Sequence, residues 1–190
     1  KTLPKTKTIF MALCLAVVGA VYPGRAGAQI LSADPLFKAA ERGNHDDVQK
    51  ALMAGSSANI RGGGGSTALI VSARIGAGDV VDLLLAHGAI VNLVDAEGNS
   101  ALIHGAVNDH DDIIRALLDA GAAINHANKQ GETALMRAAG AGSQFAVEIL
   151  LEAGAEPALT DFTGRTALDL ARENRRDQIV RTFRKAGIRR

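Results

Sequence analysis

The hexapeptide TALMRA, at residues 133–138, returns along the chain in related forms. The related segments are equally spaced along the chain: DPLFKA at 34–39, TALIVS at 67–72, SALIHG at 100–105, TALMRA itself and TALDLA at 166–171. A glycine recurs with the same spacing, at Gly55, Gly88, Gly121, Gly154 and Gly187. An asparagine does so as well, at Asn59, Asn92 and Asn125. Three markers with one period identify a repeat protein, in which each unit stacks on its neighbours.

Each unit predicts two short helices followed by a loop. Thr133 can cap a first helix of small and apolar residues, and a turn separates it from a second apolar segment at 147–151. The second helix ends at the recurring glycine, which suits a left-handed C-cap. A polar stretch such as 95–98, of the form D-x-x-G, then leads to the next unit. We therefore expect an all-α repeat solenoid of paired antiparallel helices with hairpin-like finger loops.

This pattern resembles the ankyrin repeat, a 33-residue unit with a T-P-L-H-x-A signature. The resemblance covers residues 34–187. It departs from the signature because only Pro35 keeps the proline and no copy has the histidine. The resemblance implies about five repeats, at 34–61, 62–94, 95–127, 128–160 and 161–190. The first and last carry more polar second helices, as the ends of a stack require.

The N-terminal segment, at positions 1–28, has the layout of a secretory signal peptide. Lys1, Lys5 and Lys7 precede an uncharged apolar run at 9–22, and an A-x-A sequence at 26–28 suits cleavage after Ala28. The predicted organisation is a signal peptide at 1–28, a short lead at 29–33 and the repeat domain at 34–190. We expect a periplasmic or secreted protein with no transmembrane segment after cleavage. Retention of the apolar run as a membrane anchor is the alternative.

Composition limits the classes of function. Cys14, in the apolar run, is the single cysteine, so the mature domain would have no disulfide. A net charge of +1 and 3% aromatic residues argue against a nucleic-acid partner. We expect a monomer with no cofactor.

One acidic cluster, at residues 109–112, is the strongest candidate for chemistry, with His104 nearby in the sequence. The register places it at a turn and the start of a second helix, where Asp serves capping and the helix dipole. The five histidines fall at separated positions, so we predict no catalytic or metal-binding residue. A metal-dependent enzyme remains the alternative from another class. The basic segment from Arg172 onward leaves a third possibility, an anionic membrane surface or an acidic partner.

The resemblance implies protein–protein binding through a concave face, made of the fingers and the exposed ends of the first helices. By register, the candidate residues are Arg61, Ser66, Arg74, Ile75, Val94, Glu97, Asn99, Val107, Asn108, Lys129, Gln130, Glu132, Phe162, Thr163 and Arg165. Phe162 is the expected anchor, because exposed aromatic residues dominate many interfaces. The expected function is a non-catalytic periplasmic protein–protein interaction module, and the sequence does not separate assistance of the partner from inhibition. An inhibitor or immunity-type protein that blocks a toxin or enzyme is the alternative.

The first finger differs from the others. Its sequence RGGGGS, at residues 61–66, places glycine where later fingers have Asp or Asn. Because no side chain would brace this turn, we expect it to be the most mobile finger or to let a partner's backbone approach closely.

Overall fold

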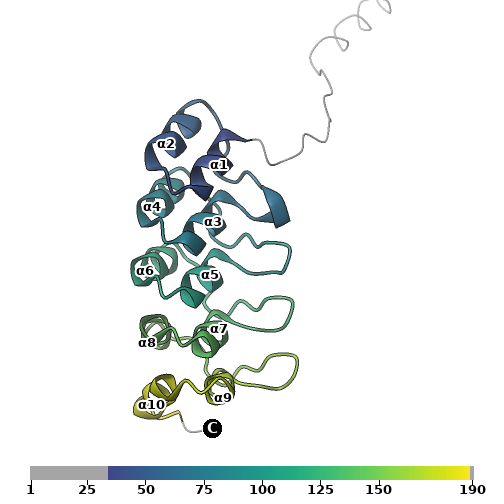
Figure 1. Ribbon diagram of the computed structural model, residues 1–190, viewed down its shortest axis with the longest axis vertical. Helices are drawn as coiled ribbons and strands as arrows, with labels where there is room; N and C mark the ends of the chain where they lie inside the picture. The colour runs from purple at the N-terminus through teal and green to yellow at the C-terminus, as the bar shows by residue number, and fades with distance from the viewer. Residues whose placement is uncertain (1–33, 189–190) are drawn as a thin grey trace, which may run out of the picture.

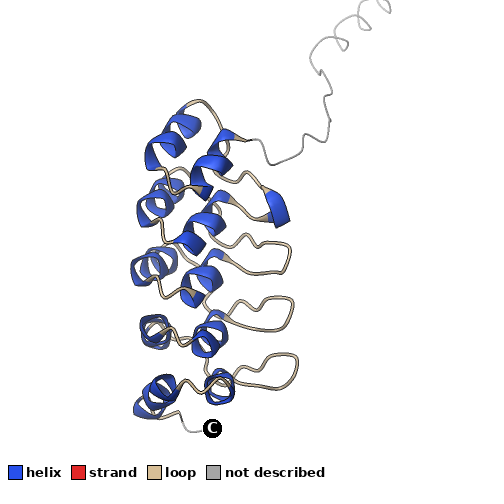
Figure 2. Cartoon of the chain, in the orientation of Figure 1, coloured by secondary structure: helices blue, strands red, loops and turns tan. Residues whose placement is uncertain are grey.

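The computed structural model describes residues 34–188, and within them the chain forms a row of stacked helix pairs (Figures 1 and 2). The pairs are α1 (Pro35–Glu41) with α2 (His45–Met53), α3 (Ala68–Ile75) with α4 (Gly78–Ala86), α5 (Ala101–Val107) with α6 (Asp111–Asp119), α7 (Ala134–Ala141) with α8 (Gln144–Glu152), and α9 (Ala167–Glu173) with α10 (Asp177–Lys185). No strand is assigned in this part of the chain. The predicted all-α repeat solenoid is confirmed. The predicted signal peptide and the lead at 29–33 lie outside the described residues.

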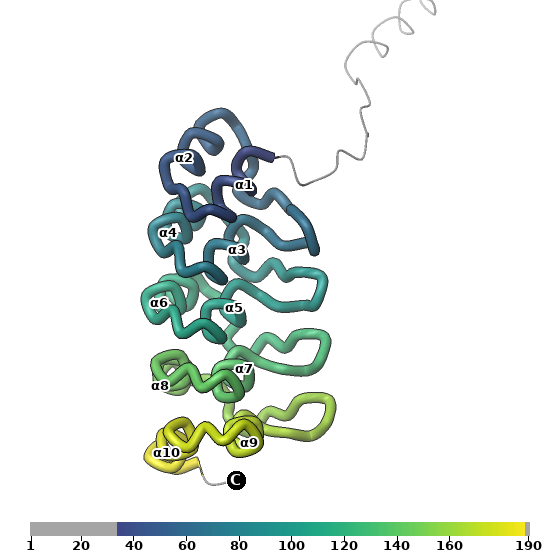
Figure 3. The backbone as a smooth tube through the Cα atoms, viewed as in Figure 1, coloured from purple at the N-terminus to yellow at the C-terminus, as the bar shows by residue number. Residues whose placement is uncertain are grey.

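The two helices of each pair belong to different layers (Figure 3). The odd-numbered helices form an inner row and the even-numbered helices form an outer row. A finger loop projects beyond the inner row at each junction between repeats. Each inner helix packs on the inner helices before and after it, so the row continues from α1 to α9.

Helix ends follow the signals in the repeat. The Thr133 side-chain oxygen accepts a hydrogen bond from the Met136 N–H at 3.3 Å, and the equivalent residue caps α3, α5 and α9. Just past each outer helix, the recurring glycine has a φ between 78° and 93°. That left-handed conformation suits glycine, which explains why this residue recurs in every repeat.

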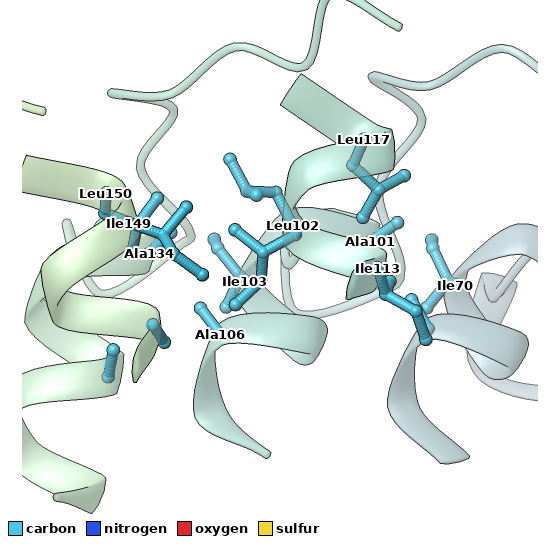
Figure 4. Packing of buried hydrophobic residues seen from close by; sticks show 14 of the residues in the cluster. Ile70, Ala101, Leu102, Ile103, Ala106, Ile113, Leu117, Ala134, Ile149 and Leu150 are labelled. Carbon is cyan, nitrogen blue, oxygen red and sulfur yellow. The ribbon is translucent and has the colours of Figure 1, made fainter. Parts of the chain in front are cut away.

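The inner and outer rows enclose one continuous core. The repeating leucine is at most 1% exposed in every repeat, from Leu36 to Leu168. Figure 4 shows part of this core around Leu102 and Ile103 of α5. Small residues such as Ala101 and Ala134 are fully buried beside them, and this lets neighbouring helices approach closely.

The recurring asparagines, in the loops that follow the outer helices, join successive repeats. Asn92 accepts a hydrogen bond from the Ala123 N–H at 2.8 Å and donates to the Gly121 carbonyl at 3.2 Å. Asn59 makes the same pair of bonds to the repeat that follows it. Ala158, at the register position after Asn125, cannot continue the series. The asparagine marker in the sequence is therefore a bridge that fixes the stacking of one repeat on the next.

Candidate binding face

Four finger loops, at residues 61–67, 94–100, 127–133 and 160–166, lie side by side along one edge of the solenoid (Figure 1). One backbone hydrogen bond joins each finger to the next: Ala96 N–H to Gly64 carbonyl at 2.8 Å, Lys129 N–H to Glu97 carbonyl at 3.0 Å, and Phe162 N–H to Gln130 carbonyl at 3.1 Å. The donors occupy the same register position in successive repeats, and so do the acceptors. The repeat therefore holds the fingers at a fixed spacing as one array.

A buried side chain fixes the turn inside three of the fingers. Asn128 Oδ1 accepts hydrogen bonds from the Gln130 and Glu132 N–H groups, both at 2.9 Å. Asp95 and Asp161 accept the equivalent pairs in their own fingers. Each of these three turns is therefore braced from within, because its Asp or Asn side chain accepts hydrogen bonds from backbone N–H groups.

Asp161 also binds Arg165 through two contacts that converge on one oxygen, from Nε at 2.9 Å and Nη2 at 2.8 Å to Oδ2. The Thr163 hydroxyl donates to the other carboxylate oxygen at 2.7 Å. Burial alone would raise the pKa of Asp161, but the hydrogen bonds from Thr163 and Arg165 outweigh it and hold the pKa well below its usual range. Arg165 makes a second ion pair with Glu173 at 3.3 Å, so it serves the architecture of the last finger.

Asp95 pairs with a histidine. His104 Nε2 lies 2.7 Å from Asp95 Oδ2, and the two side chains are 19% and 6% exposed. Burial would raise the pKa of Asp95, but hydrogen bonds from His104 and from backbone N–H groups lower it overall. His104 therefore links helix α5 to its own finger.

The first finger corrects the expectation of an unbraced turn. Gly62 is buried, and a Cβ atom there would lie 2.1 Å from the Phe37 ring of α1. The space left by the missing side chain is therefore filled by Phe37, which is 3% exposed. Arg61 supplies the bracing instead: its Nη1 donates to the Gly65 carbonyl and, at 2.7 Å, to the Val94 carbonyl of the next finger. Only the tip of this finger, at Gly63 and Gly64, is open, with no atom within 4 Å of an added Cβ.

The finger tips carry exposed side chains. Phe162 is 79% exposed, yet its ring lies against finger 127–133, since a Cβ built on Gly131 would meet Phe162 Cδ1 at 2.8 Å. Lys129 packs over Gly98 in the same way. Phe162 is thus held by the neighbouring finger on one side while the rest of the ring faces solvent.

A hollow of about 270 Å³ interrupts the inner-helix surface beside the fingers. It lies where α5, α7 and α9 meet, and it is lined by Val107, Glu132, Met136, Arg137, Gly140, Ala141, Leu170 and Asn174. Val107 and Glu132 are among the residues that the sequence predicts for the binding face. The fingers and this hollow together form a continuous candidate surface of the inner row.

This architecture has a counterpart among known families. A family model of ankyrin repeats (3 copies) matches residues 36–128 and 117–189. The chain belongs to the ankyrin-repeat family. A comparison with curated proteins returned no match. Ankyrin repeats are generally protein–protein interaction modules and are typically non-catalytic. The inner surface is therefore the candidate binding site.

The ankyrin register places the candidate residues at three levels of exposure. The exposed group is Arg74, Ile75, Glu97, Asn108, Lys129, Gln130, Phe162 and Thr163, and the partly exposed group is Arg61, Val94, Asn99, Val107, Glu132 and Arg165. Ser66 is the exception, at 8% exposure. Its backbone closes the first finger by accepting from the Gly62 N–H at 2.8 Å, which turns the residue inward. The expected exposure of Ser66 is therefore wrong, and its contribution to partner binding stays a prediction.

The acidic cluster at 109–112 does not assemble into a site. Asp109 Oδ1 accepts a hydrogen bond from the Ala146 N–H at 2.7 Å, which joins two repeats. Asp112 bonds the N–H of its neighbour in the first turn of α6, and His104 faces Asp95. Within residues 34–188, no group of three or more His, Cys, Asp or Glu residues could hold a metal ion. These acids serve the turn and the helix start.

The basic segment from Arg172 onward spans the end of α9, a turn and α10. Ile179, Val180 and Phe183 are buried against the stack, whereas Arg181 and Arg184 are exposed. The last two residues, at 189–190, lie outside the described part of the chain. Among the helices between residues 34 and 188, none has the length and apolar character needed to cross a membrane.

Two surface features escape the sequence reasoning. Phe145, on α8, is 60% exposed and occupies the register position of Asp46, Asp79 and Asp112. Gly140 and Ala141 open the hollow on α7 where other repeats have larger side chains. Both are departures from the repeat, and comparison of equivalent positions could have found them.

Proposed function

We propose that this ankyrin-repeat protein is a non-catalytic binding module, which holds a protein partner on its inner face in the periplasm or outside the cell. The observation that carries the proposal is the stacked finger array, with Phe162 exposed at its end and the α7 hollow beside it. Exposed aromatic side chains held in place by their own protein lose little entropy when they bind a partner. The signal-like sequence at 1–28 supports export.

Rigidity supports binding through this face. The fingers are tied by backbone hydrogen bonds, and their turns are braced by Asp95, Asn128 and Asp161. Asn bridges join the repeats in the loops that follow the outer helices. A partner therefore meets a surface that is already ordered, and the free energy of ordering loops does not oppose association.

Affinity capture with matched baits tests the proposal. The full chain serves as bait in extracts of the exported fraction, together with the variants Phe162→Ala and Met53→Ala. Met53, on α2 of the first repeat, is 75% exposed and so matches Phe162 in exposure and apolar character. The expected result is a partner retained by wild type and by Met53→Ala but depleted with Phe162→Ala. Equal retention by all three baits would contradict the proposed face.

Export is tested separately. N-terminal sequencing of the protein recovered from cells is expected to begin at Gln29. A mature chain that keeps residues 9–22 would contradict cleavage and favour the anchor.

A further inference from the structure

The hollow on α7 exists because two small residues replace larger ones. At the register position of Gly140, the other inner helices have Glu41, Arg74, Val107 and Glu173; at that of Ala141, they have Arg42, Ile75, Asn108 and Asn174. The missing side chains leave a hollow of about 270 Å³ at this point. Its position between α5 and α9 places it on the inner face.

The chemistry of the hollow differs between its floor and its rim. Val107, Met136 and Leu170 contribute apolar atoms below, and Met136 and Leu170 are only 1% and 6% exposed. Arg137 and Asn174 stand at the rim. The Asn174 amide Nδ2 donates to the Leu170 carbonyl at 2.8 Å, which leaves its Oδ1 as an acceptor that could take a backbone N–H from outside.

The rim carries an excess of positive charge. Arg137 is 43% exposed, and its one ion pair, with Glu132, is long at 3.4 Å. Glu132 also lines the hollow, but it is only 15% exposed and its Oε2 is shared with the Asn128 amide at 3.3 Å. Arg176 donates from Nε to the Gly140 carbonyl at 3.2 Å, and its guanidinium has no acidic partner in the described part of the chain. Two guanidinium groups beside the hollow therefore favour a carboxylate.

We propose that this hollow takes one apolar side chain of Val, Leu, Ile or Met size from an extended segment of the protein partner, next to an Asp or Glu that binds Arg137. The inference rests on the proposed function, because it names what the inner face recognises. The apolar floor receives the side chain, Arg137 pairs with the carboxylate, and Asn174 Oδ1 accepts from the backbone of the segment. Large aromatic or basic side chains would be disfavoured, by size and by charge respectively.

Gly140 offers a test that leaves the fold intact. A Cβ added there would meet its nearest atom, Asn174 Nδ2, at an ordinary 3.6 Å, and the backbone is helical. Ala in a helix interior is more favourable than Gly, so Gly140→Ala should fold at least as stably as wild type. Gly140→Leu places a larger side chain in the hollow, and Gly140→Ala keeps the test valid if the larger change perturbs folding.

The experiment uses a phage-displayed library of short random peptides, selected on the full chain, followed by titration of the best synthetic peptide. Enriched peptides are expected to carry a Val, Leu, Ile or Met close in sequence to an Asp or Glu. Gly140→Leu should weaken binding about tenfold or more, and Gly140→Ala should weaken it less. Arg137→Gln should weaken binding several-fold, with an effect that shrinks at high salt. Arg115→Gln, an exposed arginine on the outer helix α6, is the matched control and should bind as wild type.

The outcomes separate this inference from the proposed function. If Gly140→Leu and Arg137→Gln bind the peptides as wild type does but Phe162→Ala does not, the proposed role of the hollow is refuted and the proposed binding face is retained. Peptides insensitive to all three variants would overturn both. A selection that enriches no peptide would also overturn the inference, since a single extended segment should suffice for recognition. Only apolar-acidic peptides lost with the Gly140 and Arg137 variants support it.

Discussion

Replacing Gly62 by Ala tests how the first finger is built. Gly62 has a φ of −103°, so Ala can adopt its backbone without strain. The obstacle is Phe37, whose ring atoms would lie 2.1–2.5 Å from the new methyl group. Because Phe37 is 3% exposed, its ring must shift within the packed first repeat or leave it.

The expected destabilisation follows from this geometry. Overpacking of a core costs about 1–3 kcal/mol, and full expulsion of a buried Phe forfeits about 1.5–3 kcal/mol. Reduced entropy of the unfolded chain returns about 0.4–1 kcal/mol for Gly to Ala. The net loss in the free energy of unfolding is about 0.5–2.5 kcal/mol. At about 2–4 °C per kcal/mol for a chain of this size, the Tm should fall by roughly 1–10 °C.

Far-UV circular dichroism is the suitable probe, since the chain has no Trp and its one Tyr, Tyr22, lies outside the described residues. Gly63→Ala is the control: nothing lies within 4 Å of its Cβ, so its Tm should not fall. In a Phe37→Ile background, which matches Ile70 and Ile103, Gly62→Ala should lose most of its effect, with a coupling of about 1 kcal/mol or more. Equal Tm values for Gly62→Ala and Gly63→Ala would refute the reasoning.

Three further changes probe the scaffold. Asn92→Ala should lower the free energy of unfolding by about 1–2 kcal/mol in urea titrations, because two inter-repeat hydrogen bonds are lost; an unchanged midpoint would mean that the bridge contributes nothing. Leu135→Ala should cost about 2–5 kcal/mol as a truncation at a site 1% exposed, and a smaller loss in the same assay would show that the core is loosely packed there. The lowered pKa of Asp161 adds stability above the unfolded pKa of about 3.9, and this contribution disappears as pH falls through the lower folded value. Asp161→Asn should therefore be less stable at pH 7 but lose less stability below about pH 4, whereas parallel pH profiles would contradict the ion pair with Arg165.

Much of the scaffold could be predicted from the sequence because its signals are local. Thr133 caps the residue three positions later, and Gly121 ends a helix through its own backbone conformation. Each signal is visible in a short window and returns in every repeat. The register then assigns the fingers and inner-helix ends without knowledge of any contact.

The candidate site was harder to predict from the sequence, because its details depend on contacts between residues that are distant in sequence. Gly62 is explained by Phe37 of the preceding inner helix, and the exposure of Phe162 is limited by Gly131 of the neighbouring finger. Ser66 follows the finger register, yet its turn buries it. The hollow could not be predicted from the sequence, because it forms only where α5, α7 and α9 pack together around the small residues of α7.

Site-specific photo-crosslinking tests the central claim most directly. A photoreactive residue replaces Gln130, exposed at a finger tip, or Arg115, exposed on the outer helix α6, in the full chain expressed in its own cells. Binding through the inner face predicts a discrete partner adduct from position 130 and none from position 115. An adduct from position 115 alone would contradict the account.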